Sequence, residues 1–311
     1  MKKNLTPSIS DFEKVHKLSS YYEDISGPGL VLKIKRFLLL KFKYIQYILA
    51  RKNIFSGRNL KTNLFFGKSY TLPAKDIDAY ATYFFGALWI AEAPLTKFFI
   101  KNINEDTVFY DIGANYGFYS CLASEFIKTG QVHSFEPNPE VFVFLEKNTK
   151  DYSNLFLNKK ALGSTAGDVS LFSATAAGGY RSGPSSIIES VTLHDAHSGL
   201  YTSSMVVPMT TLDNYVSKNK KPTILKIDVE GAELQVIEGG TNFFKSNSPL
   251  LVMEVWGGDR GDIFSLKAIK KIIELGYINI FRIDSDGNME IINDPINSLP
   301  ISDYENWIFK K

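Results

Sequence analysis

The sequence of 311 residues is poor in several features that mark particular classes of protein. Its single cysteine, Cys121, excludes a disulfide within the chain and fits a reducing compartment. It lacks a run of about eighteen apolar residues, so no membrane-spanning helix is expected. Residues 1–20 lack the apolar stretch of a signal peptide. The formal net charge of +2 is too small to indicate nucleic acid as the main partner. These absences predict a cytoplasmic protein.

The composition is that of a globular protein with a substantial core, with 44% hydrophobic and 22% charged residues. Before about residue 100, helical patterns and irregular polar stretches dominate. After it, short β-branched or aromatic runs alternate with helical patterns, which indicates a parallel sheet built from βαβ units. We therefore expect a helical extension over 1–100 and an α/β domain over 101–311. The extension is expected to contact substrate, a membrane surface or a second subunit.

The expected elements of the α/β domain alternate along the chain. Strands are predicted over 107–111, 131–136, 155–161, 169–173, 205–210, 223–228, 250–255, 278–283 and 307–310. Helices are predicted over 116–128, 140–150, 211–217, 234–244 and 265–275. The stretch 173–204 is polar and contains glycine, so we expect a long loop that binds substrate at the rim of the sheet.

Two segments of the extension have helical patterns of their own. Residues 31–52 carry apolar side chains at spacings of three and four, with basic residues over much of the remaining surface; the apolar ones are Val31, Ile34, Leu38, Phe42, Ile45 and Leu49. Such a helix can lie on an anionic membrane surface, or it can pack on the main domain or a second subunit. The aromatic-rich stretch 76–103 is predicted to be helical, and to close over a cleft or pack against the sheet.

The first segment that carries chemistry is Asp111-Ile112-Gly113-Ala114-Asn115-Tyr116-Gly117. An apolar strand ends there on a carboxylate and turns tightly into a helix. Gly113 and Gly117 permit backbone conformations and close approaches that side chains forbid. Ligands of open α/β sheets bind at the carboxyl ends of the strands, where this turn is expected to lie. By itself the turn fits several kinds of nucleotide-binding protein.

The second segment is Phe135-Glu136-Pro137-Asn138, at the end of the next strand and about twenty residues beyond the turn. A carboxylate there can accept hydrogen bonds from ribose hydroxyls; alternatively, Glu136 caps the following helix. The spacing G-x-G-x-x-G of dinucleotide sites is missing. Asp111 would also repel a pyrophosphate and attract a cationic ligand. The two acids together favour S-adenosylmethionine over NAD.

Two later strands also end on acids. Ile224-Leu225-Lys226-Ile227-Asp228 leads to Glu230 and Gly231, and Leu250-Leu251-Val252-Met253 leads to Glu254. Four strands of one sheet that end on acids are hard to explain by core packing, so we expect these carboxylates to converge on one rim.

Residues 107–256 resemble the FkbM family of S-adenosylmethionine-dependent methyltransferases. The matching pieces are the turn 111–117 with Phe118-Tyr119-Ser120, Phe135-Glu136-Pro137-Asn138-Pro139, Ala161-Leu162-Gly163, Thr210-Thr211-Leu212-Asp213, 226–233 and Glu254. The resemblance implies a Rossmann-like class I methyltransferase sheet that is mostly parallel with a reversed last strand. It also implies O-methylation of a hydroxyl on a saccharide or related natural product, such as a precursor of a surface polysaccharide.

The residues expected to bind the cofactor are Asp111, Gly113, Asn115, Gly117, Glu136, Pro137, Asn138, Ala161 and Asp228. Asp228 is the first candidate for a general base, with Glu230 and Glu254 as the next candidates; alternatively, Asp228 holds the methionine ammonium group or a loop amide. The residues expected to contact substrate are Tyr180, Arg181, His194, His197 and Glu254.

Other polar residues receive weaker assignments. His194 and His197 could serve as bases or form a metal pair, but no third ligand has helpful spacing, so we interpret them as surface residues and expect no metal site. His133 is expected to pack inside a strand, and Cys121 is given no role. The alternative functions are an NAD-dependent oxidoreductase and a cofactor-binding module without turnover.

Overall fold

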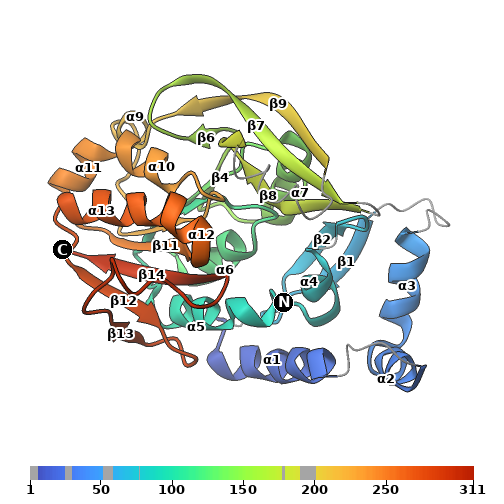
Figure 1. The fold of residues 1–311 in the computed structure, drawn as a ribbon. Helices are drawn as coiled ribbons and strands as arrows, with labels where there is room; N and C mark the ends of the chain where they lie inside the picture. Colours follow the sequence, from blue (N-terminus) through green and yellow to red (C-terminus); the bar gives the residue numbers. More distant parts are fainter. Residues whose placement is uncertain (1–5, 25–29, 52–58, 77, 177–178, 190–200) are drawn as a thin grey trace.

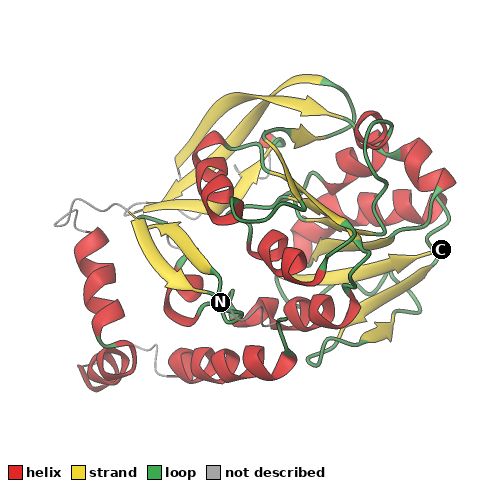
Figure 2. Cartoon of the chain, turned by 180° about the vertical axis from the view of Figure 1, so that it is seen from behind, coloured by secondary structure: helices red, strands yellow, loops and turns green. Residues whose placement is uncertain are grey.

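The computed structural model describes residues 6–24, 30–51, 59–76, 78–176, 179–189 and 201–311 (Figure 1). The N-terminal part begins with helices α1 (Ile9–Asp24), α2 (Leu30–Leu40) and α3 (Phe42–Arg51). A hairpin of β1 (Asn59–Asn63) and β2 (Ser69–Pro73) follows, then α4 (Tyr80–Phe85), the short helix η1 (Ile90–Glu92) and α5 (Ala93–Asn102). Both views show α2 and α3 at the edge of the molecule, on the side away from the C-terminus (Figure 1, Figure 2).

The centre of the molecule is an eight-stranded sheet in the order β13-β12-β14-β11-β10-β3-β4-β5. Its strands are β3 (Val108–Ile112), β4 (Gln131–Phe135), β5 (Leu155–Asn158), β10 (Ile224–Ile227), β11 (Leu250–Trp256), β12 (Asn279–Ile283), β13 (Met289–Ile291) and β14 (Tyr304–Lys310). The run from β11 to β5 is parallel, and β14 lies antiparallel between β11 and β12. The predicted Rossmann-like sheet with a reversed last strand is confirmed.

Helices cover both faces of this sheet (Figure 2). One face packs against α5, α6 (Phe118–Phe126) and α7 (Pro139–Thr149). The other packs against α9 (Leu212–Val216), α10 (Glu233–Gly239), α11 (Thr241–Ser246) and α13 (Leu266–Glu274). Between β11 and α13 the chain forms α12 (Gly258–Arg260) and η2 (Gly261–Ser265). Strands β3 and β10 are buried along their whole length, because they lie in the middle of the sheet with helices on both sides.

A second sheet replaces much of the predicted loop. Its order is β6-β9-β7-β8, from β6 (Ala161–Leu162), β7 (Gly167–Ala176), β8 (Gly179–Ser186) and β9 (Tyr201–Thr210). The interpretation of 173–204 as loop is therefore wrong for the ends of β7 and β9 and for all of β8. Gly179–Ser186 is rich in glycine and serine, which gives it little strand propensity of its own. Its pairing with β7 supplies the order that the local sequence does not.

The N-terminal part departs from the expected continuous helices in two places. The helix predicted over 31–52 is broken at Lys41, whose φ of 43° lies in the left-handed region. The stretch 76–103 is interrupted at Gly86, because its φ is 73° and an added Cβ would lie 2.3 Å from the carbonyl oxygen of Asn63. The hairpin β1–β2 was not expected. Within the described ranges, no helix combines the length and apolar character needed to cross a bilayer.

Candidate active site

The turn that follows β3 is held between the ends of two neighbouring strands. The backbone N–H groups of Gly113 and Ala114 donate to the carbonyl oxygen of Phe135, at the end of β4. On the other side, a Cβ added to Gly113 would lie 1.7 Å from the carbonyl oxygen of Asp228, which follows β10. Gly113 also has a φ of 83°. This position therefore requires glycine for both its conformation and its space.

Glu136 is buried beside this turn and is fixed by backbone donors. Its Oε2 accepts from the N–H of Asn115 at 3.0 Å, and its Oε1 accepts from the N–H of Asn138 at 2.9 Å. Burial raises the pKa of Glu136 to about 7, although the two hydrogen bonds act in the opposite direction. The alternative role as a helix cap is not observed, because the side chain of Asn138 caps α7 by accepting from Glu140 N–H. Glu136 therefore keeps free acceptor positions on its oxygens.

A first cavity opens above Glu136. Its polar lining includes Asn115, Glu136 and Asp228, and its apolar walls include Ile112, Phe135, Ala161 and Leu162. Apolar walls beside a carboxylate that can accept two hydroxyl donors suit adenine and ribose. The residues present therefore fit an adenosine cofactor.

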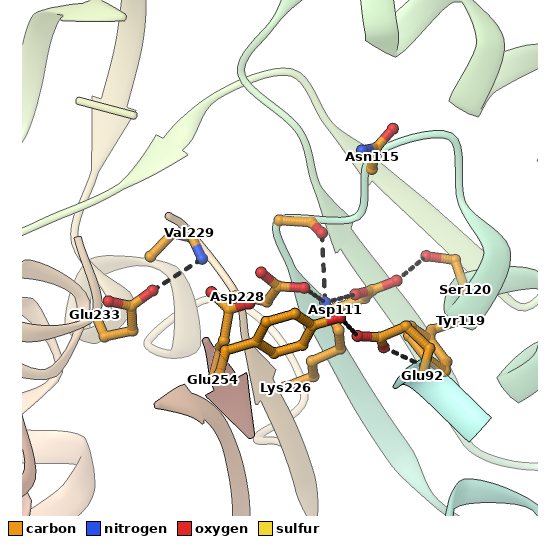
Figure 3. A network of polar contacts seen from close by, with 12 residues as sticks. Glu92, Asp111, Asn115, Tyr119, Ser120, Lys226, Asp228, Val229, Glu233 and Glu254 are labelled. Carbon is orange, nitrogen blue, oxygen red and sulfur yellow. Dashed lines mark hydrogen bonds and ion pairs between the residues drawn. The ribbon is translucent and has the colours of Figure 1, made fainter. Parts of the chain in front are cut away.

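Lys226 occupies the centre of the polar network below the turn (Figure 3). Its Nζ lies 2.9 Å from Oδ2 of Asp228 and 3.5 Å from Oδ1 of Asp111. Burial alone would lower the pKa of Lys226, but the carboxylates of Asp228 and Asp111 outweigh it and raise the pKa. Asp111 also accepts a hydrogen bond from the hydroxyl of Ser120 at 2.6 Å. Lys226 therefore stays charged and ties the ends of β3 and β10 together.

A second cavity of about 240 Å³ adjoins the first. The two share Gly113, Asn115, Gly183, Asp228 and Glu230 in their linings. The second cavity is otherwise lined by acids, aromatic side chains and residues of the N-terminal part; they include Glu92, Glu254, Tyr304, Trp89, Asp78 and Thr82. Asp228 and Glu230 thus lie where a donor in the first cavity would meet an acceptor in the second.

Three carboxylates gather at this junction. Oxygens of Asp228, Glu230 and Glu254 lie within 4.8 Å of one another. Burial raises the pKa of Glu254 well above its usual range, and the charges of Asp228 and Glu230 add to this effect. The indole N–H of Trp256 donates to Glu254 at 2.8 Å. Such a cluster can accept several hydroxyl donors, and its spacing also suits a divalent cation.

The loop after β10 has a shape that places Glu230 at the junction. Glu230 has a φ of 52°, which is uncommon for a residue with a side chain. The carboxylate of Glu233 accepts from the N–H groups of Val229 and Gly231, both at 3.2 Å, and so closes the loop around Glu230. The Oε2 atom of Glu230 lies 3.8 Å from the Nη2 atom of Arg260, with which it forms an ion pair.

Glu92 brings the N-terminal part into the site. Its carboxylate accepts from the hydroxyl of Tyr119 at 2.8 Å and from the hydroxyl of Tyr304 at 3.0 Å. Burial, and then the charge of Asp228, raise the pKa of Glu92. Tyr116 similarly donates to Asp76 at 2.6 Å. The wall of the second cavity is therefore built jointly by the extension, α6 and β14.

A comparison of the chain with known proteins decides its family. The model of the FkbM methyltransferase domain matches residues 111–282, which is more than half of the chain. The chain belongs to the FkbM methyltransferase family. The methyltransferase uses S-adenosylmethionine as its donor, in agreement with the apolar walls and the carboxylate of the first cavity.

This FkbM-family methyltransferase is similar to several individual proteins. Hexuronic acid methyltransferase AglP of Haloferax volcanii is 29% identical over 184 residues, which cover 58% of this chain and 70% of that protein. A solved FkbM methyltransferase from Methylobacillus flagellatus is 14% identical, with a TM-score of 0.42, over 66% of this chain and 44% of that one. An S-adenosylmethionine-dependent O-methyltransferase from Thermotoga maritima is 11% identical, with a TM-score of 0.40, over 83% and 80% of the two chains.

The structure brings most of the predicted cofactor residues of the methyltransferase to the first cavity. Gly113, Asn115, Glu136, Pro137, Ala161 and Asp228 line it. The other three predicted residues do not line the cavity. Asp111 pairs with Lys226, and the backbone N–H of Asn138 donates to Glu136. Gly117 precedes the first residue of α6 and lies close to Leu145.

The predicted substrate residues have mixed outcomes. Glu254 lines the second cavity, and Tyr180 and Arg181 belong to β8. His194 and His197 lie outside the described residues. His133 packs inside the sheet as expected: its Nδ1 bonds the Tyr215 hydroxyl at 2.8 Å, and burial lowers its pKa to about 4. Cys121 is completely buried.

Sequence reasoning missed Lys226, Glu92 and Tyr304. For Lys226 a signal was present, because a lysine inside the apolar run Ile224–Ile227 has to find a counter-charge when the strand is buried. Glu92 and Tyr304 lie more than 200 positions apart in the sequence, so only the fold brings them together.

Proposed function

We propose that this methyltransferase transfers a methyl group to a hydroxyl of a saccharide or related natural product, as a step in the synthesis of a surface polysaccharide. The observation that carries the proposal is the second cavity, which adjoins the donor cavity and is lined by carboxylates and aromatic rings. Sugar hydroxyls donate hydrogen bonds to carboxylates, and the flat faces of sugars pack on rings. The Haloferax relative is described as a methyltransferase for hexuronic acid, a saccharide.

The donor, when bound, supplies an activated methyl group on a sulfonium sulfur. Glu136 accepts hydrogen bonds from the ribose, and the apolar side chains of Ile112, Phe135 and Leu162 exclude water around the adenine ring. Gly113 leaves the backbone of the turn bare where the two cavities meet. The fixed orientation of donor and acceptor supplies much of the rate for a displacement of this kind.

Asp228 is our candidate for the general base, because its carboxylate lines both cavities. Lys226 holds its Oδ2, which leaves Oδ1 to take the proton of the acceptor hydroxyl. Glu230 also lines both cavities and is the second candidate. Glu254 lines only the second cavity, which is the proposed acceptor cavity. The raised pKa of Glu254 favours a protonated carboxyl, which can donate a hydrogen bond to a sugar oxygen.

Methyl transfer from labelled S-adenosylmethionine to a panel of neutral sugars, hexuronic acids and non-sugar alcohols tests this proposal. We expect product with at least one saccharide, and calorimetry should show binding of S-adenosylhomocysteine. The Asp228→Asn variant is the control for background transfer. Transfer to non-sugar alcohols alone would contradict the acceptor class, and failure to bind S-adenosylhomocysteine would contradict the donor site.

A further inference from the structure

We propose that α2 and α3 form a docking surface for a membrane that contains anionic lipids. This surface lies apart from both cavities, and the inference does not depend on the identity of the acceptor. It rests on three observations: the exposed apolar side chains, the way α3 is fixed to the body, and the charge of the surrounding sequence.

The two helices expose large apolar side chains that would normally be covered. Val31 is 66% exposed and Phe42 is 68% exposed. The same exposed set continues along both helices and comprises Val31, Ile34, Phe37 and Leu38 in α2 and Phe42 and Ile45 in α3. Five of these six belong to the apolar stripe that the sequence analysis found over 31–52. Large apolar side chains exposed on two successive helices are typical of a surface that contacts a partner or a membrane.

The exposure on α3 does not come from a helix that lacks contacts with the rest of the molecule. Tyr47 of α3 is buried, with its ring centroid 4.4 Å from that of Tyr80 in α4. The Nζ of Lys43 donates to the Thr62 hydroxyl and to the carbonyl oxygens of Tyr83 and Phe84, all at 3.0–3.1 Å. One side of α3 is therefore packed and hydrogen-bonded, while Phe42 and Ile45 are exposed.

The charge of the stretch of sequence that contains α2 and α3 indicates the occupant. Residues 25–75 contain eleven lysines and arginines and no acidic residue, although the whole chain is nearly neutral with 35 basic and 33 acidic residues. Lys35 and Lys41 are exposed among the apolar side chains. A second copy of the chain would bring the same positive charge to the contact and be repelled. A lipid surface with anionic headgroups satisfies both the apolar and the basic residues.

A short helix connects this surface with the acceptor cavity. Tyr80 and Phe84 of α4 pack against Tyr47 of α3. Thr82 of α4 lines the second cavity. Docking of α2 and α3 would therefore hold the acceptor cavity one helix away from the lipid surface, where an acceptor attached to a lipid could reach it.

Sedimentation of the full chain with lipid vesicles tests the proposal. We expect the protein to sediment with vesicles of phosphatidylcholine and phosphatidylglycerol, to stay in solution with phosphatidylcholine alone, and to be released by salt. The double variant Leu38→Ser/Phe42→Ser, which removes two exposed apolar side chains, should bind the anionic vesicles about tenfold more weakly, or weaker still. Charge reversal in Lys35→Glu/Lys41→Glu should weaken it by a similar factor.

Matched variants on other surfaces separate docking from general effects. Val206→Ser/Ile278→Ser removes apolar side chains that are 73% and 71% exposed, and Lys267→Glu/Lys270→Glu reverses exposed charges on α13. Both should bind vesicles like the wild type. The affinity for S-adenosylhomocysteine, measured in every variant, reports the folded donor site independently of docking.

Three results would overturn the proposal. The first is no sedimentation of the wild type with anionic vesicles. The second is equal loss of binding in the docking and control variants. The third is a stable dimer that Phe42→Ser disrupts while vesicles bind nothing, because a second copy would then cover the surface.

Discussion

The Nζ atom of Lys226 and the Oδ1 atom of Asp111 lie 3.5 Å apart, with only 3% and 1% of their side chains exposed. This pair joins two neighbouring parallel strands at the edge where the cofactor turn begins. Burial raises the pKa of Asp111, and the charge of Lys226 opposes that rise. Lys226 therefore makes it possible for a carboxylate to stay buried directly beneath the turn.

Removal of the ammonium group should destabilise the whole domain. Lys226→Met leaves Asp111 buried without its counter-charge, and we expect the free energy of unfolding to fall by about 3–5 kcal/mol in urea titrations. The double variant Lys226→Met/Asp111→Asn should recover part of this loss. Lys128→Met, which breaks an exposed ion pair with Glu105, is the control and should cost about 1 kcal/mol or less. Equal costs at the two lysines would contradict the role given to Lys226.

Exchange of the ribose-facing carboxylate should weaken cofactor binding. Glu136→Gln should raise the Kd for S-adenosylhomocysteine about 10- to 100-fold in calorimetry, because hydrogen bonds to the charged group are lost. Glu140→Gln, on the exposed first turn of α7, should leave the Kd unchanged.

The same carboxylate should make cofactor affinity depend on pH. The pKa of Glu136 is raised to about 7, so the group is largely protonated below this pH and ionised above it. Because the ionised form is the better acceptor for two hydroxyls, affinity should increase as the pH rises through about 7 and fall as it drops. This slope should vanish in Glu136→Gln; a slope that persists there would assign it to another group.

Catalytic and acceptor-binding roles at the junction should separate in kinetics. Asp228→Asn should keep the affinity for S-adenosylhomocysteine and lower kcat by about 10²- to 10⁴-fold, the range for loss of a general base. Glu254→Gln should act mainly on the KM of the acceptor. If Asp228→Asn instead loses cofactor binding, Asp228 holds the cofactor and Glu230 becomes the candidate base.

Two glycines with the same backbone angle test the close approach at the turn. Gly113 and Gly67 both have a φ of 83°, but only Gly113 has an atom within 4 Å of an added Cβ. Gly67→Ala should cost about 1–2 kcal/mol of stability for its conformation. Gly113→Ala should cost about 1–3 kcal/mol more, because the turn must move away from Asp228, and it should also weaken cofactor binding. Equal thermal stability of the two variants would contradict this contact.

The sequence predicted the parallel strands of the central sheet well, because each of them carries its own signal, whereas β13 was not predicted. Buried parallel strands are short apolar runs, and Val108–Ile112, Ile224–Ile227 and Leu250–Trp256 lie within a few residues of their expected ranges. The acids at the strand ends converge as expected, because parallel strands deliver their carboxyl ends to one edge.

The features that were missed depend on contacts over long distances in the chain. Strand β8 is ordered by its pairing with β7, and Glu92 is recognised only when Tyr119 and Tyr304 reach it. The break at Lys41 also has no local signal, since lysine seldom adopts a positive φ. Periodicity predicted one helix with an apolar stripe over 31–52, but the helix is broken at Lys41, and five of the six stripe residues are exposed.

The two hydrogen bonds to Glu92 limit how this enzyme can be divided or recombined. A chain shortened to begin near residue 101 would leave the hydroxyls of Tyr119 and Tyr304 without their shared acceptor and would open the acceptor cavity to water. An extension taken from a relative would need an acid at the position of Glu92, and its host would need both tyrosines. With the second cavity as the proposed acceptor site, acceptor preference depends on the extension, α6 and β14 together, and an exchange of acceptor specificity between relatives has to transfer all three.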